Sequence, residues 1–76
     1  MVIGVTMITA VPGEERSVYN NITKVPGVRE VFHVFGEFDF IAIIEVGTLT
    51  EINKAVDTIR ADEAVTSTKT IIGAEL

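Results

Sequence analysis

The 76-residue sequence contains no cysteine, no tryptophan, one tyrosine and one histidine. The absence of cysteine excludes disulfides, thiolate nucleophiles and cysteine-ligated zinc. The single histidine, His33, has no His, Asp or Glu at the spacing that a metal site needs. Neither Ser17 nor Ser67 lies in a nucleophile-elbow motif that would make His33 its base. We therefore expect no metal, no cofactor and no catalytic residue, and we interpret His33 as a packed or half-exposed strand residue.

Basic residues are also scarce, with six Lys and Arg against eleven Asp and Glu and a net charge of −5. Nucleic-acid affinity depends on Lys and Arg contacts to phosphate, so direct DNA or RNA binding is not expected. The apolar run at residues 1–11 is too short to span a membrane and lacks the basic flank of a signal peptide. We expect a cytoplasmic protein that binds neither nucleic acid nor membrane.

What the chain has in abundance is apolar surface, since 47% of its residues are hydrophobic. A chain of this length buries only about 60% of its unfolded surface. One small core cannot absorb so many apolar side chains, so many of them should lie between subunits. The composition therefore predicts an oligomer.

The hydrophobic pattern predicts four strands and two helices in the order βαββαβ. Thr48 and Glu51 form a capping box at the start of the second helix. Gly36-Glu37 fits a two-residue type II′ turn between the second and third strands. The expected strands are 2–11, 28–35, 38–46 and about 64–72, and the expected helices are 14–24 and about 49–60.

The two halves of the chain also resemble each other at an offset of 37 residues. The matching pairs are Ile22 and Ile59, Val28 and Val65, Gly36 and Gly73. Two intercalated βαβ halves predict an α+β, ferredoxin-like fold: one domain over residues 1–76, with a four-stranded antiparallel sheet and both helices on one face. The first and third strands should be central because both of their faces are apolar, and the second and fourth should be the more polar edges. A second subunit is expected on the uncovered face.

Asp39 is unusual because it stands between two phenylalanines at the start of an apolar strand. In the register set by a turn at Gly36-Glu37 it lies opposite Val34, at the end of an apolar face. A dry, unpaired carboxylate there would cost several kcal/mol. Physical chemistry alone favours a solvated Asp39 at the mouth of the hairpin, and the alternative is a carboxylate that pairs with a ligand ammonium. The alternating hydroxyls of Thr66, Thr68 and Thr70 are expected on one face, as a solvated edge or as contacts to a polar ligand.

The stretch VPGVREVFHVFGEFDFIAIIEV, followed by a capped helix and VTSTKTIIG, resembles the effector-binding (RAM) domain of the Lrp/AsnC transcriptional regulators. The resemblance covers the whole chain. Its most specific parts are Pro26-Gly27-Val28, the hairpin at residues 36–40 and the run Ser67-Thr68-x-Thr70. The resemblance implies the βαββαβ fold, dimers formed through the sheets, and rings of dimers, commonly octamers.

In that family amino-acid effectors bind between dimers, which implies a ligand-binding set in this chain. The set is Gly36, Asp39, Leu49, Ile71, Ile72 and Gly73, with Thr68 and Thr70 as additions. The resemblance favours Asp39 as the partner of the ligand ammonium, with backbone N–H groups near Gly36 or Gly73 for its carboxylate. The family's regulators carry an N-terminal helix-turn-helix domain, whereas this sequence begins at the first strand of the effector domain. The sequence is therefore either a natural stand-alone module or a fragment, and its start at Met1 favours the stand-alone module. We expect an amino-acid-sensing module that regulates without catalysis, or that co-assembles with full-length regulators.

Three alternatives remain open at this point. An ACT-like amino-acid-binding domain shares the strand and helix order but uses the first strand–helix turn, here Pro12-Gly13. A small dimeric α+β-barrel enzyme, such as a monooxygenase or isomerase, needs a pocket between helices and sheet, where only His33 is available. A purely structural ring former would assemble without any ligand.

Overall fold

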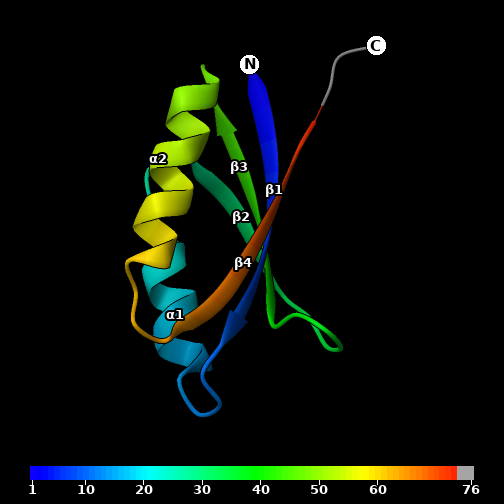
Figure 1. Ribbon diagram of the computed structural model, residues 1–76, viewed down its shortest axis with the longest axis vertical. Helices are drawn as coiled ribbons and strands as arrows, with labels where there is room; N and C mark the ends of the chain where they lie inside the picture. The colour runs from blue at the N-terminus through cyan, green and yellow to red at the C-terminus, as the bar shows by residue number, and fades with distance from the viewer. Residues whose placement is uncertain (74–76) are drawn as a thin grey trace.

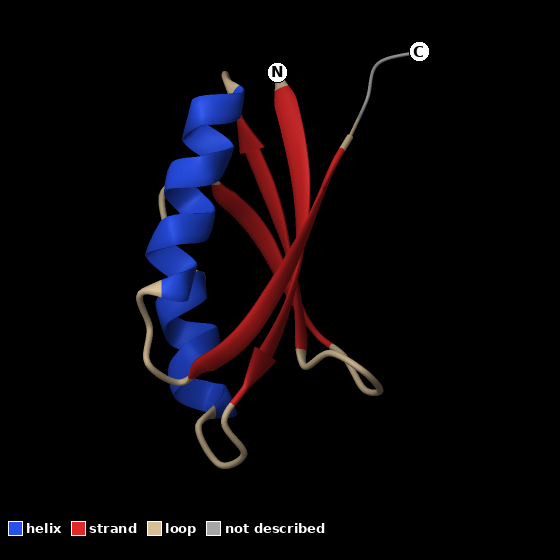
Figure 2. Cartoon of the chain, viewed as in Figure 1, coloured by secondary structure: helices blue, strands red, loops and turns tan. Residues whose placement is uncertain are grey.

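The computed structural model describes residues 1–73, so the last three residues of the predicted domain lie outside the described part. The four strands form one antiparallel sheet in the order β2-β3-β1-β4. Both helices pack on the same face of this sheet (Figure 1, Figure 2). The elements are β1 (Val2–Ala10), α1 (Glu15–Ile22), β2 (Val28–His33), β3 (Phe40–Val46), α2 (Leu49–Arg60) and β4 (Val65–Ile72). The ferredoxin-like βαββαβ fold is confirmed, with β1 and β3 central as predicted.

The hydrophobic core lies between the sheet and the helices. Alternate residues of β1 and β3 point toward the helices, because successive side chains of a strand face opposite sides. Burying one such aliphatic or aromatic side chain contributes about 1.5–3 kcal/mol. The largest buried apolar residues are Ile8, Val18, Ile22, Phe40, Ile44, Ile52 and Ile59. Neither helix in the described part of the chain is long and apolar enough to cross a membrane.

The opposite face of the sheet carries no helix (Figure 2), and its centre is also apolar. We call it the open sheet face, and it is formed by alternate residues of the four strands. Its exposed members include Ile3, Phe32 and Ile71, with 41%, 50% and 54% of their surface accessible. Val5, Met7, Ile41 and Ile43 are its half-buried centre. So much accessible apolar surface on one face is typical of an interface.

The turn before α2 and the turn between α1 and β2 each require particular residues. The Thr48 hydroxyl oxygen accepts the Glu51 N–H at 3.2 Å, and the Thr48 hydroxyl in turn donates to Glu51 Oε1 at 3.2 Å. Gly27, between α1 and β2, has φ = +93°, and a Cβ there would lie 2.6 Å from Val46 Cγ1. The capping box is thus confirmed, and Gly27 is required both by its backbone and by close packing.

The β2–β3 hairpin keeps the predicted register but not the predicted turn. His33 pairs with Phe40, and the Val34 N–H donates to the Asp39 carbonyl at 2.8 Å. Beyond that bond the two strands separate, and no backbone hydrogen bond joins residues 35 and 38 among the described residues. Gly36 has φ = +112° in this wider loop. The hairpin therefore ends in an open loop that starts two residues earlier than predicted, rather than in a tight two-residue turn.

Candidate functional site

The predicted ligand-binding residues form two groups at opposite ends of the sheet. Gly36 and Asp39 belong to the hairpin, where the end of β1 meets the start of β3. The second group lies where β1 begins, close to the start of α2 (Figure 1), and consists of Leu49, Ile71, Ile72 and Gly73. From Gly4, which pairs with Ile72, to Thr9 beside the hairpin, β1 rises about 17 Å. A single chain therefore does not bring the two groups together.

Asp39 has a partner within its own chain. The ladder between β1 and β3 ends at the pair of Ile8 and Phe40. Asp39 extends it, since its N–H donates to the Ile8 carbonyl at 2.9 Å and its Oδ2 accepts the Ala10 N–H at 2.8 Å. The side chain is half-buried, and Oδ1 accepts no hydrogen bond from the described residues. The carboxylate therefore has both a structural role and an available acceptor. Its Oδ2 is hydrogen-bonded to the end of β1, and its Oδ1 could accept a hydrogen bond from a ligand.

The group at the other end is apolar and accessible. Leu49, Ile71 and Ile72 expose 54%, 54% and 40% of their surface. The Gly73 N–H donates to the Ile3 carbonyl at 2.8 Å and is therefore occupied. Of the two predicted sources of an N–H for a ligand carboxylate, the Gly36 loop is the better placed.

The threonines of β4 do not share one face, contrary to the prediction. Thr70 and Thr68 pair with Thr6 and Ile8 and face the helices, and the hydroxyl oxygens of Thr70 and the buried Thr6 lie 3.0 Å apart. A register shift follows Thr9, and there the Thr66 hydroxyl lies 2.8 Å from that of Thr9, on the open sheet face. The shift breaks the alternation that the sequence pattern assumes. Thr70 has a structural hydrogen bond, and Thr68 is half-buried.

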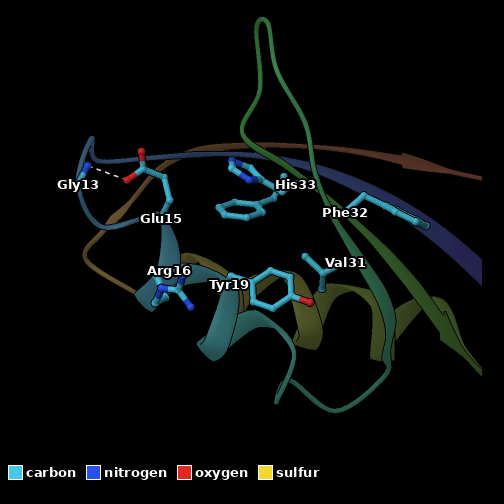
Figure 3. A pocket seen from close by; sticks show the side chains of 8 residues that line it. Gly13, Glu15, Arg16, Tyr19, Val31, Phe32 and His33 are labelled. Carbon is cyan, nitrogen blue, oxygen red and sulfur yellow. Dashed lines mark hydrogen bonds between the residues drawn. The ribbon is translucent and has the colours of Figure 1, made fainter.

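A cleft of about 670 Å³ lies between α1 and the edge strand β2 (Figure 3). We call it the α1–β2 cleft. His33 lines it, exposed to solvent and stacked on Phe40 with ring centroids 5.0 Å apart. The His33 imidazole makes no hydrogen bond to another side chain among the described residues, so no carboxylate there orients it for general-base chemistry. The side chains that line the cleft are those of Glu15, Arg16, Tyr19, Val31, Phe32, His33 and Phe40.

Sequence reasoning did not identify this cleft as a site. It considered Gly13 and His33 separately, as markers of an ACT-like turn and of an enzyme pocket, and the structure places both on the same cleft. Arg16 and Tyr19 flank the cleft from α1. They are three residues apart, about one helical turn, and so lie on the same side of the helix. Their spacing on a short amphipathic helix was the available signal, but it is also typical of a solvated helix flank.

The sequence of residues 2–74 matches the model of the Lrp/AsnC ligand binding domain. The chain belongs to this family.

Two curated relatives carry a similar segment within longer proteins. Homocitrate synthase of Sulfolobus acidocaldarius is 39% identical over 54 residues, which is 71% of this chain and 12% of that protein. The HTH-type transcriptional regulator LysM of Saccharolobus solfataricus is 35% identical over 51 residues, which is 67% of this chain and 36% of that protein. The chain therefore spans about an eighth and about a third of the lengths of these relatives.

Solved structures share the fold over nearly the whole chain. The hypothetical protein PHS023 from Pyrococcus horikoshii has a TM-score of 0.88 and 28% identity, covering 100% of this chain and 93% of that one. The transcriptional regulator NMB0573 from Neisseria meningitidis, solved as its L-Met complex, has a TM-score of 0.83 and 16% identity, covering 97% and 50%. At 16% identity the second likeness shows the fold alone.

Proposed function

We propose that this domain senses an amino acid at a site built between copies of the chain in an oligomeric ring. The observation that carries the proposal is the separation of the two residue groups. Asp39 with Gly36 and the apolar group with Leu49 lie at opposite ends of one sheet. A neighbouring copy that places its Leu49 end against this hairpin would complete one site from two chains. Occupancy of such a site is coupled to assembly.

The chemistry of the two groups suits an amino acid. Asp39 Oδ1 is free to accept the ligand ammonium, because only Oδ2 is engaged by Ala10. The backbone N–H groups of the Gly36 loop are available to the ligand carboxylate, because the β2–β3 ladder ends before this loop. Leu49 and Ile72 would supply an apolar surface for the side chain on the helix side of the sheet. Ile71 faces the open side and would contact the ligand only from the neighbouring edge of that face. Charge-assisted hydrogen bonds at one end and burial at the other would define the effector.

The relatives support effector sensing rather than catalysis. Similar segments occur in a homocitrate synthase and in an HTH-type transcriptional regulator, an enzyme and a DNA-binding protein. One relative is an enzyme and the other a DNA-binding regulator, so the similar segment is common to both while catalysis and DNA binding are not, and a separate sensing role would fit both proteins. The L-Met complex of a regulator with this fold adds an amino acid as a precedent.

The open sheet face supports pairing of two copies. Its centre is apolar, and the exposed Ile3, Phe32 and Ile71 extend this apolar surface. The exposed polar residues Glu30, Ser67 and Lys69 lie on its two edge strands, so the apolar centre is the part that would pair with a second copy. Two such faces packed together would form the dimer, and end-to-end contacts between dimers would form the ring. The same face would also accept the corresponding domain of a full-length Lrp/AsnC regulator, which is how this chain would act on such a partner.

A thermal-shift panel of the twenty amino acids, read together with light scattering, tests the proposal. We expect one chemical class to raise the melting temperature and to change the mass of the assembly. Asp39→Asn is the matched variant, because its amide oxygen still accepts the Ala10 N–H while the charge is lost. It should abolish the ligand-dependent shift. An equal shift in Asp39→Asn would refute the role of Asp39, and no response to any amino acid would favour a purely structural ring former.

A further inference from the structure

The α1–β2 cleft shares no residue with the proposed effector site. It opens on the helix side of β2, because Val31 and His33 pair with Ala42 and Phe40, whose side chains are buried under the helices. Phe32 also lines the cleft but belongs to the open sheet face. Two copies that pack through their open sheet faces would therefore cover Phe32 and leave the helix-side wall of the cleft uncovered. The cleft is therefore an independent candidate for binding.

The cleft wall is aromatic on both sides. Tyr19 of α1 and His33 of β2 each approach Phe40, with ring centroids 6.0 Å and 5.0 Å apart. Tyr19 still has 40% of its surface accessible, and His33 is exposed. Figure 3 shows Tyr19 on α1 and His33 on β2, with another ring between their side chains. Accessible ring faces around a shared aromatic base favour a flat ring as ligand.

The charged groups at the rim are not equivalent. Glu15 Oε1 accepts the Gly13 N–H at 2.7 Å, so this carboxylate is engaged in the turn before α1. Arg29, farther along β2, does not line the cleft and is paired with Glu45, whose hydrogen bond and charge raise the pKa of Arg29. Arg16 makes no ion pair with any residue of the described chain, and it lines the cleft. An unpaired guanidinium beside aromatic rings suits a carboxylate, which accepts two of its N–H groups at once.

We propose that the α1–β2 cleft binds an aromatic carboxylate. The ring of the ligand lies against the accessible sides of Tyr19 and His33, which cover the buried Phe40, and its carboxylate pairs with Arg16. The volume of about 670 Å³ lies within the range of small-molecule sites, roughly 300–1,000 Å³. This site is additional to the proposed effector site, and neither proposal depends on the other.

The chain provides its own reporters for this cleft. Tyr19 is the only tyrosine and there is no tryptophan, so tyrosine emission arises from the cleft wall alone. His33 is the only histidine, so its imidazole proton signals report the opposite wall. Phenylacetate is the probe, and phenylacetamide is its uncharged counterpart. We expect phenylacetate to change the Tyr19 emission saturably and to shift the His33 signals, and phenylacetamide to bind at least fivefold more weakly.

Arg16→Gln should weaken phenylacetate binding at least fivefold and leave phenylacetamide binding unchanged. Arg60→Gln is the matched control, because it removes the same charge from an exposed position on α2. It should keep the affinity of the parent, and circular dichroism should show that both variants are folded. Equal phenylacetate affinity in Arg16→Gln and Arg60→Gln overturns the proposal, as does the absence of a saturable response at both reporters. Asp39→Asn should leave phenylacetate binding intact, so failure of the amino-acid site and failure of this site are distinguishable.

Discussion

Replacing Asp39 with alanine leaves the Ala10 N–H at the end of β1 without its acceptor. That bond is 2.8 Å long, joins residues 29 positions apart, and is partly buried. A hydrogen bond to a charged group contributes about 1.5–3 kcal/mol, and partial exposure places this one at the lower end, about 1.5 kcal/mol. A change of 1 kcal/mol moves the melting temperature of a domain of this size by about 4–8 °C. The expected loss for Asp39→Ala is therefore about 6–12 °C.

Asp39→Asn separates the hydrogen bond from the charge. Its amide oxygen still accepts the Ala10 N–H, so we expect it to lose less than half of the melting-temperature decrease of Asp39→Ala. The assay is calorimetry or circular dichroism melting at one fixed chain concentration, because the stability of an oligomer depends on concentration. Hydrogen exchange at the Ala10 amide should accelerate in Asp39→Ala and much less in Asp39→Asn.

An Asp39→Ala variant that melts within about 2 °C of the parent would refute this reasoning, because the Ala10 bond would then contribute nothing measurable. Equal losses in the alanine and asparagine variants would also contradict it, since they would assign the effect to charge rather than to the retained acceptor. Either result would return Asp39 to the simple interpretation of a solvated residue at the mouth of a hairpin.

Two further predictions test packing and assembly. Gly27→Ala should destabilise the fold by about 1–3 kcal/mol more than Gly13→Ala in urea unfolding. Both glycines have φ = +93°, so the backbone strain is the same. A Cβ at Gly27 would lie 2.6 Å from Val46, whereas no described atom lies within 4 Å of a Cβ at Gly13. Equal losses would mean that backbone strain explains both. Ile41→Asp, at the centre of the open sheet face, should convert the assembly to monomers in light scattering after gel filtration. The exposed Asn53→Asp adds the same charge and should leave the assembly unchanged. An unchanged mass for Ile41→Asp would exclude this face as the interface.

The fold was predictable because its determinants are local and periodic. Apolar residues on both faces identified β1 and β3 as the central strands. The offset of 37 residues matched Val28 with Val65, and these two residues begin β2 and β4. The pairing of His33 with Phe40 followed from the position of Gly36. The tip of the hairpin did not follow, because the strands diverge where Asp39 turns to bond with β1.

The details of both candidate sites depend on tertiary placement that a sequence pattern does not contain. The β1–β3 ladder ends at the pair of Ile8 and Phe40, before it reaches Ala10. The Ala10 N–H therefore takes the Asp39 side chain as its acceptor. The register shift after Thr9 places Thr66 on the other face of the sheet from Thr68, and the sequence pattern does not show this shift. The α1–β2 cleft exists because α1 has only eight residues and leaves the edge of β2 uncovered.

The two kinds of contact proposed for the assembly have different symmetries, and this determines how effector sites are counted. The open sheet face would pair with its own copy, which is a closed two-fold contact. The end-to-end contact joins the Asp39 hairpin of one chain to the Leu49 end of another, so each chain uses two different patches. Contacts of this second kind close into a ring or continue as a filament, depending on the rotation between neighbours. A closed ring would thus contain one complete effector site per chain, and an effector that binds across the contact would favour closure by stabilising every junction at once.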